Sequence, residues 1–449
     1  MYANAGGLTS TGSVTLVEHV EPGFGNELGV DFGFATASGD FDADGYDDLA
    51  ISADDAPVGS VPGAGTVDIY KGGPTGLSYL KTLHQNVPGM KDKCESNEHF
   101  GLSLAAGDFN DDGRADLAIG VLEKISGKLG AGAVHVVYGG KHGLTPSHDE
   151  IWSQNTSGIK EKAEAGDTFG STLATGDIDG DGISDLIVGV PGELRQHDAI
   201  EASGAVAVIF GSEHGLTSSG DAVFDHFQAY GSAGPAFFGQ VLASGRFKGP
   251  GGAEIVVGAP NEFVVANNAG AVLFIPFVNR KPNFVGAHSL AFGPSNLPGD
   301  EPRMGASLAV GDFNGDLVDD LAIGLPGSGY FGVAGAGMAV VMKGGATGLD
   351  SLNAPYISRN TGTIFGSCQE NSQFGATLAA ADFNGDGKCD LAVGAPQDDY
   401  NDTDAGDVTV LPGLATSALL DTSSNSQFWS QLAINAATYL HGEFGKRLN

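Results

Sequence analysis

The stretch "ADFNGDGKCDLAVGAP", residues 381–396, decides the fold, because it sets crowded polar side chains directly before a short apolar run. Its oxygen-bearing side chains are Asp382, Asn384, Asp386 and Asp390, and the apolar run is 391–393. Carboxylates held this close repel one another, and a buried strand beside them worsens the repulsion. The stretch therefore needs a compensating cation or a specialised turn.

The same stretch recurs along the chain at a nearly constant interval. The loops begin at residues 40, 108, 177, 246, 312 and 382, so the intervals are 68, 69, 69, 66 and 70 residues. The copy that begins at 246, within "GRFKGPGGAEIVVG", has diverged from the others. A fixed period of this kind indicates a repeat architecture.

Each repeat carries a Phe-Gly or Met-Gly pair, the polar loop, an apolar run such as "DLAIG", and a second run such as "GAGTVDIY". These runs are too short for helices and are bounded by Gly, Pro and Asp, which favours buried strands. Four strands per repeat predict an all-β, seven-bladed propeller, with a solenoid as the alternative. We expect one domain over 1–449, with six complete blades and a partial closing blade. The expected repeats are 31–98, 99–167, 168–236, 237–302, 303–372 and 373–442, and the closing blade combines 6–22 with 443–449.

Composition limits the partners of the chain. The formal net charge of −34 disfavours nucleic acid and anionic lipid, which present phosphates, and favours cations. No apolar stretch approaches the roughly 20 residues that span a bilayer, so we expect no transmembrane segment. Three scattered cysteines predict neither a disulfide framework nor a zinc site. Residues 1–22 lack the pattern of a signal peptide. We expect a monomeric propeller whose natural chain continues beyond Asn449.

The intact loops read D-x-[DN]-x-D-[GL]-x-x-D, which predicts calcium binding. Oxygen side chains at positions 1, 3, 5 and 9 and a backbone carbonyl at position 7 supply about six or seven hard ligands. Glycine at position 6 allows the sharp turn. An EF-hand is excluded, because position 12 holds Ile or Val instead of Glu. A solvated Asx turn without metal is the alternative, but five periodic copies argue against it.

We therefore expect about five Ca²⁺ sites, which brace the fold. The loop that begins at 246 offers Arg246, Lys248 and Glu254, so we expect a plain turn there. Leu317 replaces the glycine at position 6 of loop five and is expected to strain the turn. The predicted ligands, with position 7 acting through its carbonyl, are Asp40, Asp42, Asp44, Tyr46 and Asp48; Asp108, Asn110, Asp112, Arg114 and Asp116; Asp177, Asp179, Asp181, Ile183 and Asp185; Asp312, Asn314, Asp316, Val318 and Asp320; and Asp382, Asn384, Asp386, Lys388 and Asp390.

The segment "FGATLAAADFNGDGKCDLAVGAP", residues 374–396, resembles the FG-GAP repeat of integrin alpha subunits and related bacterial proteins. The resemblance covers nearly the whole chain. It implies a seven-bladed propeller with calcium loops on its lower face. It also implies ligand contacts on the upper face, from loops that join strands two to three and four to one. Loop four departs from the pattern, and no inserted adhesion domain, leg domain or membrane span is visible, so integrin-type signalling is not implied.

These features predict a calcium-binding extracellular module that recognises a protein or carbohydrate ligand. Extracellular modules of this kind are tuned to roughly 10⁻⁴ to 10⁻³ M calcium, which favours a secreted or cell-surface location. The alternative is an enzyme, a hydrolase or lyase with its site in the central upper pocket, although no catalytic motif is recognisable. Ordinary solvated loop side chains are the competing interpretation of the candidate contacts. The candidate ligand contacts are Glu193, Arg195, His197, Phe263, Tyr330, Phe331, Asp398, Asp399 and Tyr400.

Overall fold

The structure is a computed structural model of the chain. It describes residues 2–4, 7–9, 16, 31–194, 203–230, 237–262, 269–290, 301–330, 332–399, 405–416, 418–423, 425–430 and 446–447. Within these residues the regular structure is almost entirely β, apart from the helix α1 (His226–Tyr230) and a 3₁₀ turn at Pro146–His148. The fold is an all-β propeller of four-stranded blades, as the repeat predicted.

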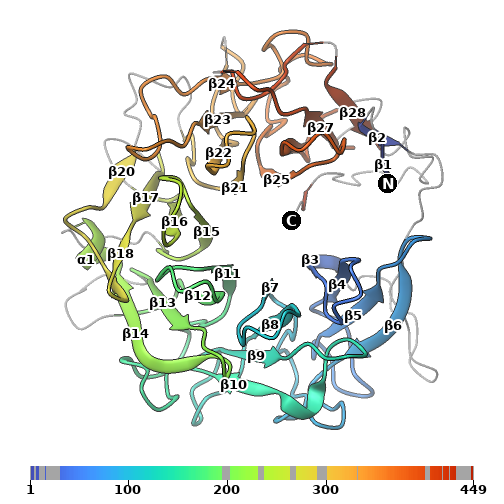
Figure 1. Cartoon of the computed structure of the whole chain (residues 1–449), viewed down its shortest axis with the longest axis vertical. Coiled ribbons are helices and arrows are strands. Elements are labelled where there is room, and N and C mark those ends of the chain that lie inside the picture. Colours follow the sequence, from blue (N-terminus) through green and yellow to red (C-terminus); the bar gives the residue numbers. More distant parts are fainter. Residues whose placement is uncertain are drawn as a thin grey trace. The chain divides into compact units, whose positions relative to one another are not determined.

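The described residues form six four-stranded sheets, and each sheet takes its strands in chain order (Figure 1). The blades, numbered along the chain, have the following strands. Blade one contains β3 (Phe32–Gly39), β4 (Asp48–Ala53), β5 (Thr66–Lys71) and β6 (Ser78–Leu83). Blade two contains β7 (Leu104–Gly107), β8 (Asp116–Val121), β9 (Ala133–Val137) and β10 (Glu150–Trp152). Blade three contains β11 (Thr172–Gly176), β12 (Asp185–Val190), β13 (Ala205–Phe210) and β14 (Thr217–Asp225).

Blade four contains β15 (Val241–Gly245), β16 (Glu254–Ala259), β17 (Ala271–Ile275) and β20 (His288–Leu290). Its last two strands are separated by a small hairpin, β18 (Phe277–Val278) and β19 (Lys281–Pro282). Blade five contains β21 (Leu308–Gly311), β22 (Asp320–Leu325), β23 (Met338–Met342) and β24 (Tyr356–Ile357). Blade six contains β25 (Thr377–Ala381), β26 (Asp390–Ala395), β27 (Asp407–Leu411) and β28 (Gln427–Ser430).

The chain divides into two compact units. The first comprises Leu16–Leu242 and Phe277–Phe284, and so holds blades one to three and the β18–β19 hairpin. The second comprises Met1–Thr15, Ala243–Pro276 and Val285–Asn449, and so holds most of blade four and blades five and six.

The second strand of each blade lies inside its sheet, between the first and third strands. All six residues of β8, β12, β16, β22 and β26 are buried, which explains why the "DLAIG" runs are apolar without alternation. Neighbouring sheets bury phenylalanines between them: Phe41 and Phe100 share one core cluster with Leu117 and Ile119. The cores are thus built between blades as well as within them.

The Phe-Gly pair and the glycine before the third strand meet between neighbouring blades. A Cβ added to Gly65 would lie 2.2 Å from the backbone oxygen of Phe100, and one added to Gly132 would lie 2.3 Å from that of Phe169. The backbone N–H of Phe100 donates to the carbonyl of Ala64 (2.9 Å). The same contact joins Gly337 to Phe374 in the second unit. Two of the repeated motifs therefore lock adjacent blades together, which a side chain at the glycine would prevent.

The prediction of a seventh, partial blade is wrong for the described residues, which hold six blades. Residues 7–9 were expected in the closing blade, but they form β2 (Gly7–Thr9), which pairs with β1 (Tyr2–Asn4) in a two-stranded sheet. The backbone of Leu8 is held by the side chain of Gln427, through bonds of 2.8 and 3.2 Å, and Leu8 packs against the cluster around Trp429. The N-terminal residues thus fold back on themselves and dock on blade six. Most of the remaining closing-blade segments, 10–15, 17–22 and 443–445, lie outside the described residues.

Candidate functional site

Five acidic loops join the first and second strands of blades one, two, three, five and six. Position 9 of each loop is the first residue of the second strand, and its carboxylate accepts two backbone N–H groups. In loop one, Asp48 accepts from Phe41 (3.2 Å) and Gly72 (2.8 Å). The same pair of bonds is made by Asp116 with Phe109 and Gly139, by Asp185 with Ile178 and Gly211, by Asp320 with Phe313 and Gly344, and by Asp390 with Phe383 and Gly413. Position 9 therefore ties each loop to the end of the third strand.

Burial makes these position-9 carboxylates costly to ionise. Burial is the largest cause that raises the pKa of Asp116 and Asp185 to about 7 and that of Asp320 to about 6. The pKa values of Asp48 and Asp390 are raised for the same reason. In each case the backbone donors oppose the shift without cancelling it. A cation beside the carboxylate would favour its charged form.

Position 1 shapes the loop. Asp382 accepts the backbone N–H groups of Gly385 (2.6 Å), Asp386 (3.1 Å) and Gly387 (2.8 Å). Asp312 does the same in loop five, where Leu317 donates (2.7 Å) although its φ is 65° and its side chain is 91% exposed. The expected left-handed backbone at Leu317 is therefore present.

The loop side chains fit a divalent cation. Carboxylate oxygens of Asp40, Asp42 and Asp48 lie within 4.8 Å of one another, as do those of Asp177, Asp179 and Asp185. Oδ1 of Asp42 is buried and has no hydrogen-bond partner among the described residues. A buried acceptor of this kind requires a partner, and a bound cation or a water molecule would satisfy it. Hard oxygen donors that converge in this way are the donor set that Ca²⁺ prefers.

Loop four is built differently. Lys248 occupies position 3, and its Nζ lies 2.6 Å from Oε1 of Glu254 at position 9. An ammonium group of the chain itself thus neutralises the buried carboxylate. This arrangement matches the plain turn expected from the sequence.

The opposite ends of the strands carry a second repeated feature. Gln85 donates to Glu123 (2.9 Å), and Gln154 donates to Glu193 (2.6 Å), where each glutamate follows the second strand of the next blade. In the second unit Arg359 takes the place of the glutamine and lies 3.6 Å from Asp398 and in contact with Asp407. These side chains are buried, so they belong to the framework beneath the loops.

The candidate ligand contacts differ in how much of each side chain is exposed. Glu193 and Asp398 are only 2% and 3% exposed, which leaves little of either carboxylate for a ligand. Tyr330 is half-buried and packs against the core cluster of Phe247 and Met304. Asp399 is exposed, and its N–H donates to the side chain of Gln369 (3.1 Å). Arg195, His197, Phe263, Phe331 and Tyr400 lie outside the described residues.

A pocket that sequence reasoning missed lies at this same end of blades five and six. It has a volume of about 320 Å³ and is formed by the loop after β22 together with residues that precede β21 and β25. Glu301, Arg303 and Asn371 are exposed within it. From the sequence, the one indication of this pocket is the position of its residues. They lie in the loop between the second and third strands of blade five and in the connections that lead into the first strands of blades five and six. Its lining residues are Glu301, Arg303, Pro326, Gly327, Ala334, Gly335, Asn371 and Gln373.

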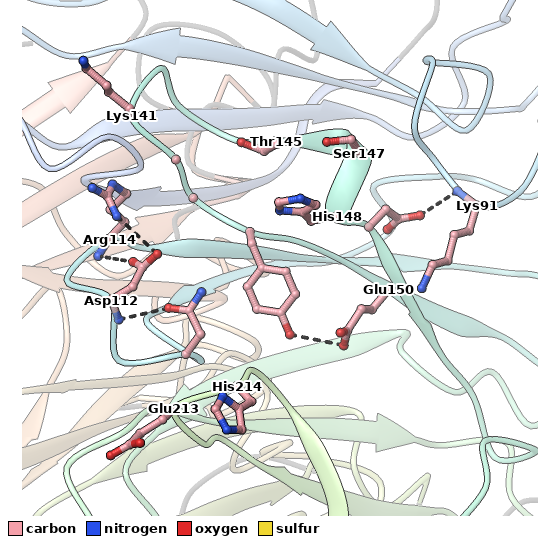
Figure 2. A pocket seen from close by; sticks show the side chains of 15 residues that line it. Lys91, Asp112, Arg114, Lys141, Thr145, Ser147, His148, Glu150, Glu213 and His214 are labelled. Atoms are coloured by element: carbon pink, nitrogen blue, oxygen red, sulfur yellow. Dashed lines mark hydrogen bonds and ion pairs between the residues drawn. The ribbon is translucent and has the colours of Figure 1, made fainter.

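A larger cleft, of about 720 Å³, borders acidic loop two in the first unit. Figure 2 shows Asp112 and Arg114 at one end and Lys91 at the other, with His148 and His214 on opposite sides. Arg114 pairs with Asp112 (3.2 Å), and Glu150 accepts the hydroxyl of Tyr138 (3.2 Å). The cleft therefore mixes acidic and basic groups, most of which are exposed.

A propeller whose blades repeat an acidic loop and an inter-blade Phe-Gly contact defines the class of this protein. The FG-GAP repeat model matches the chain five times, over 32–70, 100–137, 169–209, 304–342 and 374–411. The chain therefore carries five FG-GAP repeats. The unmatched interval contains blade four, where Lys248 replaces the metal-ligand pattern.

Curated relatives share the repeats. Phosphatidylinositol-glycan-specific phospholipase D from Bos taurus is 26% identical over 382 residues, which cover 81% of this chain and 43% of that protein. Integrin alpha-PS2 from Drosophila melanogaster is 35% identical over 172 residues, 37% of this chain and 12% of that protein. Integrin alpha-5 from Xenopus laevis is 30% identical over 237 residues, 51% of this chain and 20% of that protein. The chain spans less than half the length of these relatives.

Solved structures give weaker likenesses. The periplasmic gluconolactonase PpgL from Pseudomonas aeruginosa matches with a TM-score of 0.44 and 12% identity, covering 90% of this chain and 88% of that chain. The rhamnogalacturonan lyase YesX matches with a TM-score of 0.35 and 13% identity, covering 80% and 69%. Neither likeness supports an activity. Within the described residues, no helix is long and apolar enough to cross a membrane.

Proposed function

We propose that this protein is a calcium-braced recognition module, which binds a protein or carbohydrate ligand at the strand ends opposite its acidic loops. The observation that carries the proposal is a difference between the loops at the two ends of the strands. The acidic loops repeat the same backbone contacts five times, whereas the opposite loops differ in sequence and form a pocket around Glu301 and Arg303.

Calcium binding is supported by the donor set of the loops. Five loops offer three or four carboxylates each, and a cation would satisfy the buried Oδ1 of Asp42, which has no hydrogen-bond partner among the described residues. Asp40, Asp42, Asp44 and Asp48, the carbonyl of Tyr46, and the equivalent positions of the other four loops would hold the ion. The ion would supply positive charge that offsets the repulsion between these carboxylates.

Ligand recognition is supported by the form of the opposite face of the blades. Identical calcium loops cannot distinguish one ligand from another, whereas variable loops on a rigid framework commonly carry binding function. The pocket at Glu301, Arg303 and Asn371 offers one anion, one cation and one amide within a small volume. Such a mixture suits the hydroxyl, carboxylate or amide groups of a glycan or a peptide.

A secreted or cell-surface location belongs to this proposal, because loops of this kind bind calcium at concentrations found outside cells. The integrins among the relatives are consistent with it.

The enzyme alternative would rest on the buried pair Glu98 and Glu123, where burial, followed by the charge of Glu98, raises the pKa of Glu123 to about 8. A raised carboxyl pKa is typical of a general acid. However, Asp167 and Glu193 occupy the equivalent positions in the next blade, where Gln154 donates to Glu193 (2.6 Å) and burial raises the pKa of Asp167 to about 6. A repeated pair favours a structural role over a single active site.

A glycan array and a pull-down with extracellular proteins would identify the ligand, and variants would locate the site. Arg303→Ala and Glu301→Ala should each weaken binding at least tenfold while the unfolding midpoint stays within about 1 °C, because both side chains are exposed. Asp386→Ala should lower stability in calcium and leave the affinity of the folded fraction intact. If Asp386→Ala abolishes binding without unfolding and the pocket variants bind normally, the ligand is bridged by calcium and the proposed site is wrong.

A further inference from the structure

Every acidic loop has a lysine or arginine side chain on it, although the chain has only 21 such residues against 55 acidic ones. In the loops of blades two and six this residue occupies position 7, whereas in the others it comes from another segment. The ion pairs are Lys71 with Asp42 and Asp44, Arg114 with Asp112, Arg280 with Asp179 and Asp181, Lys343 with Asp316, and Lys388 with Asp386.

The pairing follows the charge of each loop. Loops one and three have an aspartate at position 3, Asp42 and Asp179, and there the basic group bridges positions 3 and 5. The other three loops have asparagine at position 3, and their basic group contacts position 5 alone. The basic side chain therefore contacts two carboxylates in the loops with aspartate at position 3 and one carboxylate in the loops with asparagine there.

The basic groups of loops one and three come from different places. Lys71 is the last residue of β5, in the same blade as its loop. Arg280 lies in the turn of the β18–β19 hairpin, 101 residues from Asp179 in the chain. Figure 1 shows this hairpin beside β14, and the Arg280 guanidinium stacks 4.8 Å from the ring of Phe210. Two unrelated segments thus deliver a cation to the same two loop positions.

In loop four the basic side chain belongs to a ligand position of the loop itself. Lys248 lies at position 3 itself and holds Glu254 at 2.6 Å, in a loop that has lost its other ligands. In the other five loops the basic side chain comes from position 7 or from a separate segment. Lys71 and Arg280 keep 34% and 35% of their side chains exposed, so both can swing into water.

We propose that these basic side chains are built-in counterions, which hold the acidic loops together without metal and which calcium must displace, so that they set the calcium affinity of each loop. The inference rests on the proposed calcium binding. A carboxylate oxygen that bonds an ammonium group cannot also ligate the ion at full strength, and the two cations repel each other. Calcium at loop three would release Arg280, and with it one of the contacts that fasten the hairpin to blade three.

Loop one permits a test at a single site, because Tyr46 is the only aromatic residue at position 7 among the five loops. Terbium(III) replaces calcium in oxygen sites, and a tyrosine next to it excites its emission. Tyr46→Phe should remove the part of the terbium signal that comes from loop one, and Tyr138, which lines the cleft at loop two, would account for any remainder. Calcium titrated against bound terbium then measures the affinity of this loop.

Lys71→Gln should raise the calcium affinity of loop one about fivefold, which corresponds to the loss of a partly exposed ion pair with two carboxylates. The same variant should lower the unfolding midpoint in chelator and not in saturating calcium. Lys71→Arg should behave like the wild type. Lys128→Gln, which removes the same charge from a loop at the opposite strand ends, should change neither quantity. Arg280→Gln should repeat the chelator and calcium results for loop three.

Two results would overturn the inference, and they differ. If the wild type binds terbium and calcium while Lys71→Gln shows unchanged affinity and an unchanged midpoint in chelator, only the counterion role is wrong. If the wild type shows neither terbium emission nor a calcium-dependent midpoint, the proposed calcium function fails as well.

Discussion

The choice of residue in the acidic loops is constrained where the backbone takes a left-handed conformation. Position 6 of the acidic loops is glycine in four cases, with φ of 91° at Gly45 and 86° at Gly387. Leu317 takes the same conformation with φ of 65°. A side chain there costs roughly 1–2 kcal/mol, because its Cβ approaches the following carbonyl. The position-1 aspartate makes the conformation possible by accepting the N–H of this residue.

Leu317→Gly should therefore stabilise the protein by about 0.5–1 kcal/mol, after subtraction of the extra entropy that glycine has in the unfolded chain. No packing is lost, since the side chain is 91% exposed. Chemical unfolding in chelator measures the change without a contribution from metal. Leu317→Ala keeps the strained backbone and should leave stability within about 0.3 kcal/mol, so an equal gain from alanine would point to the exposed leucine instead of the turn.

Glu123 is a residue whose charge opposes folding. Its pKa is raised to about 8 by burial and by the negative charge of Glu98, so the folded state holds a proton that the unfolded state releases near pH 4.5. Stability therefore falls as the pH rises from about 5 to 8. Glu123→Gln keeps the acceptor for Gln85 and removes the charge.

We expect Glu123→Gln to be about 1–2 kcal/mol more stable than the wild type at pH 8.5 and nearly equal to it at pH 5. Urea unfolding at several pH values in chelator would show this as a flatter dependence on pH. Glu213→Gln removes an exposed carboxylate elsewhere in the first unit and should keep the wild-type slope. A slope that is unchanged in Glu123→Gln would mean that the pair is ionised in the folded protein.

At the scale of elements, the contact between a glycine and the next Phe-Gly pair joins one blade to another. Gly132 has φ of 84°, and an added Cβ would lie 2.3 Å from the carbonyl oxygen of Phe169. Gly127 has the same φ, but nothing lies within 4 Å of its added Cβ. A comparison of substitutions at the two glycines therefore distinguishes backbone strain, which both share, from the clash between blades, which only Gly132 would have.

Gly132→Ala should destabilise the first unit by about 3 kcal/mol or more, since backbone atoms on both sides would have to move. Gly127→Ala should cost only about 1 kcal/mol, through the backbone alone. Hydrogen exchange of β9 and β11 would show whether the loss is local to the junction of blades two and three. Equal losses in the two variants would show that the close approach between blades contributes little.

The sequence predicts the repeated elements well and their partners poorly, for a physical reason. Strands and acidic loops follow from residues near one another in the chain, such as Asp382 and Leu391. The basic partner of loop three does not, because Arg280 arrives from a hairpin 101 residues away. Glu193 and Asp398 look like loop residues because they follow a Gly-Pro-rich turn, yet Gln154 and Arg359 bury them. The recurring "HQN", "SQN" and "SRN" at the ends of the fourth strands is the signal that could have revealed this layer.

For the whole molecule, the proposed calcium binding makes one quantity decisive, namely the free energy that calcium would add to folding. Five sites that bind only the folded state, each at tenfold its Kd, contribute RT ln 11 apiece, or about 1.4 kcal/mol, and so roughly 7 kcal/mol together. The gain is divided between two compact units, three loops in the first and two in the second. Since each unit can respond by itself, calcium should raise the stability of the first unit more than that of the second.

Thermal and chemical unfolding with millimolar Ca²⁺, and again with chelator, would measure this gain. Asp386→Ala removes a proposed ligand from loop six and should reduce the gain by about one fifth, roughly 1.4 kcal/mol. In chelator it should cost only the Lys388 ion pair and the hydrogen bond that the Lys388 N–H donates to Asp386 (3.0 Å). Magnesium should give a smaller effect at the same concentration, because it demands a tighter octahedral site. A midpoint that does not respond to calcium would mean that Lys71, Arg280 and their counterparts are the permanent cations of these loops, as Lys248 is in loop four.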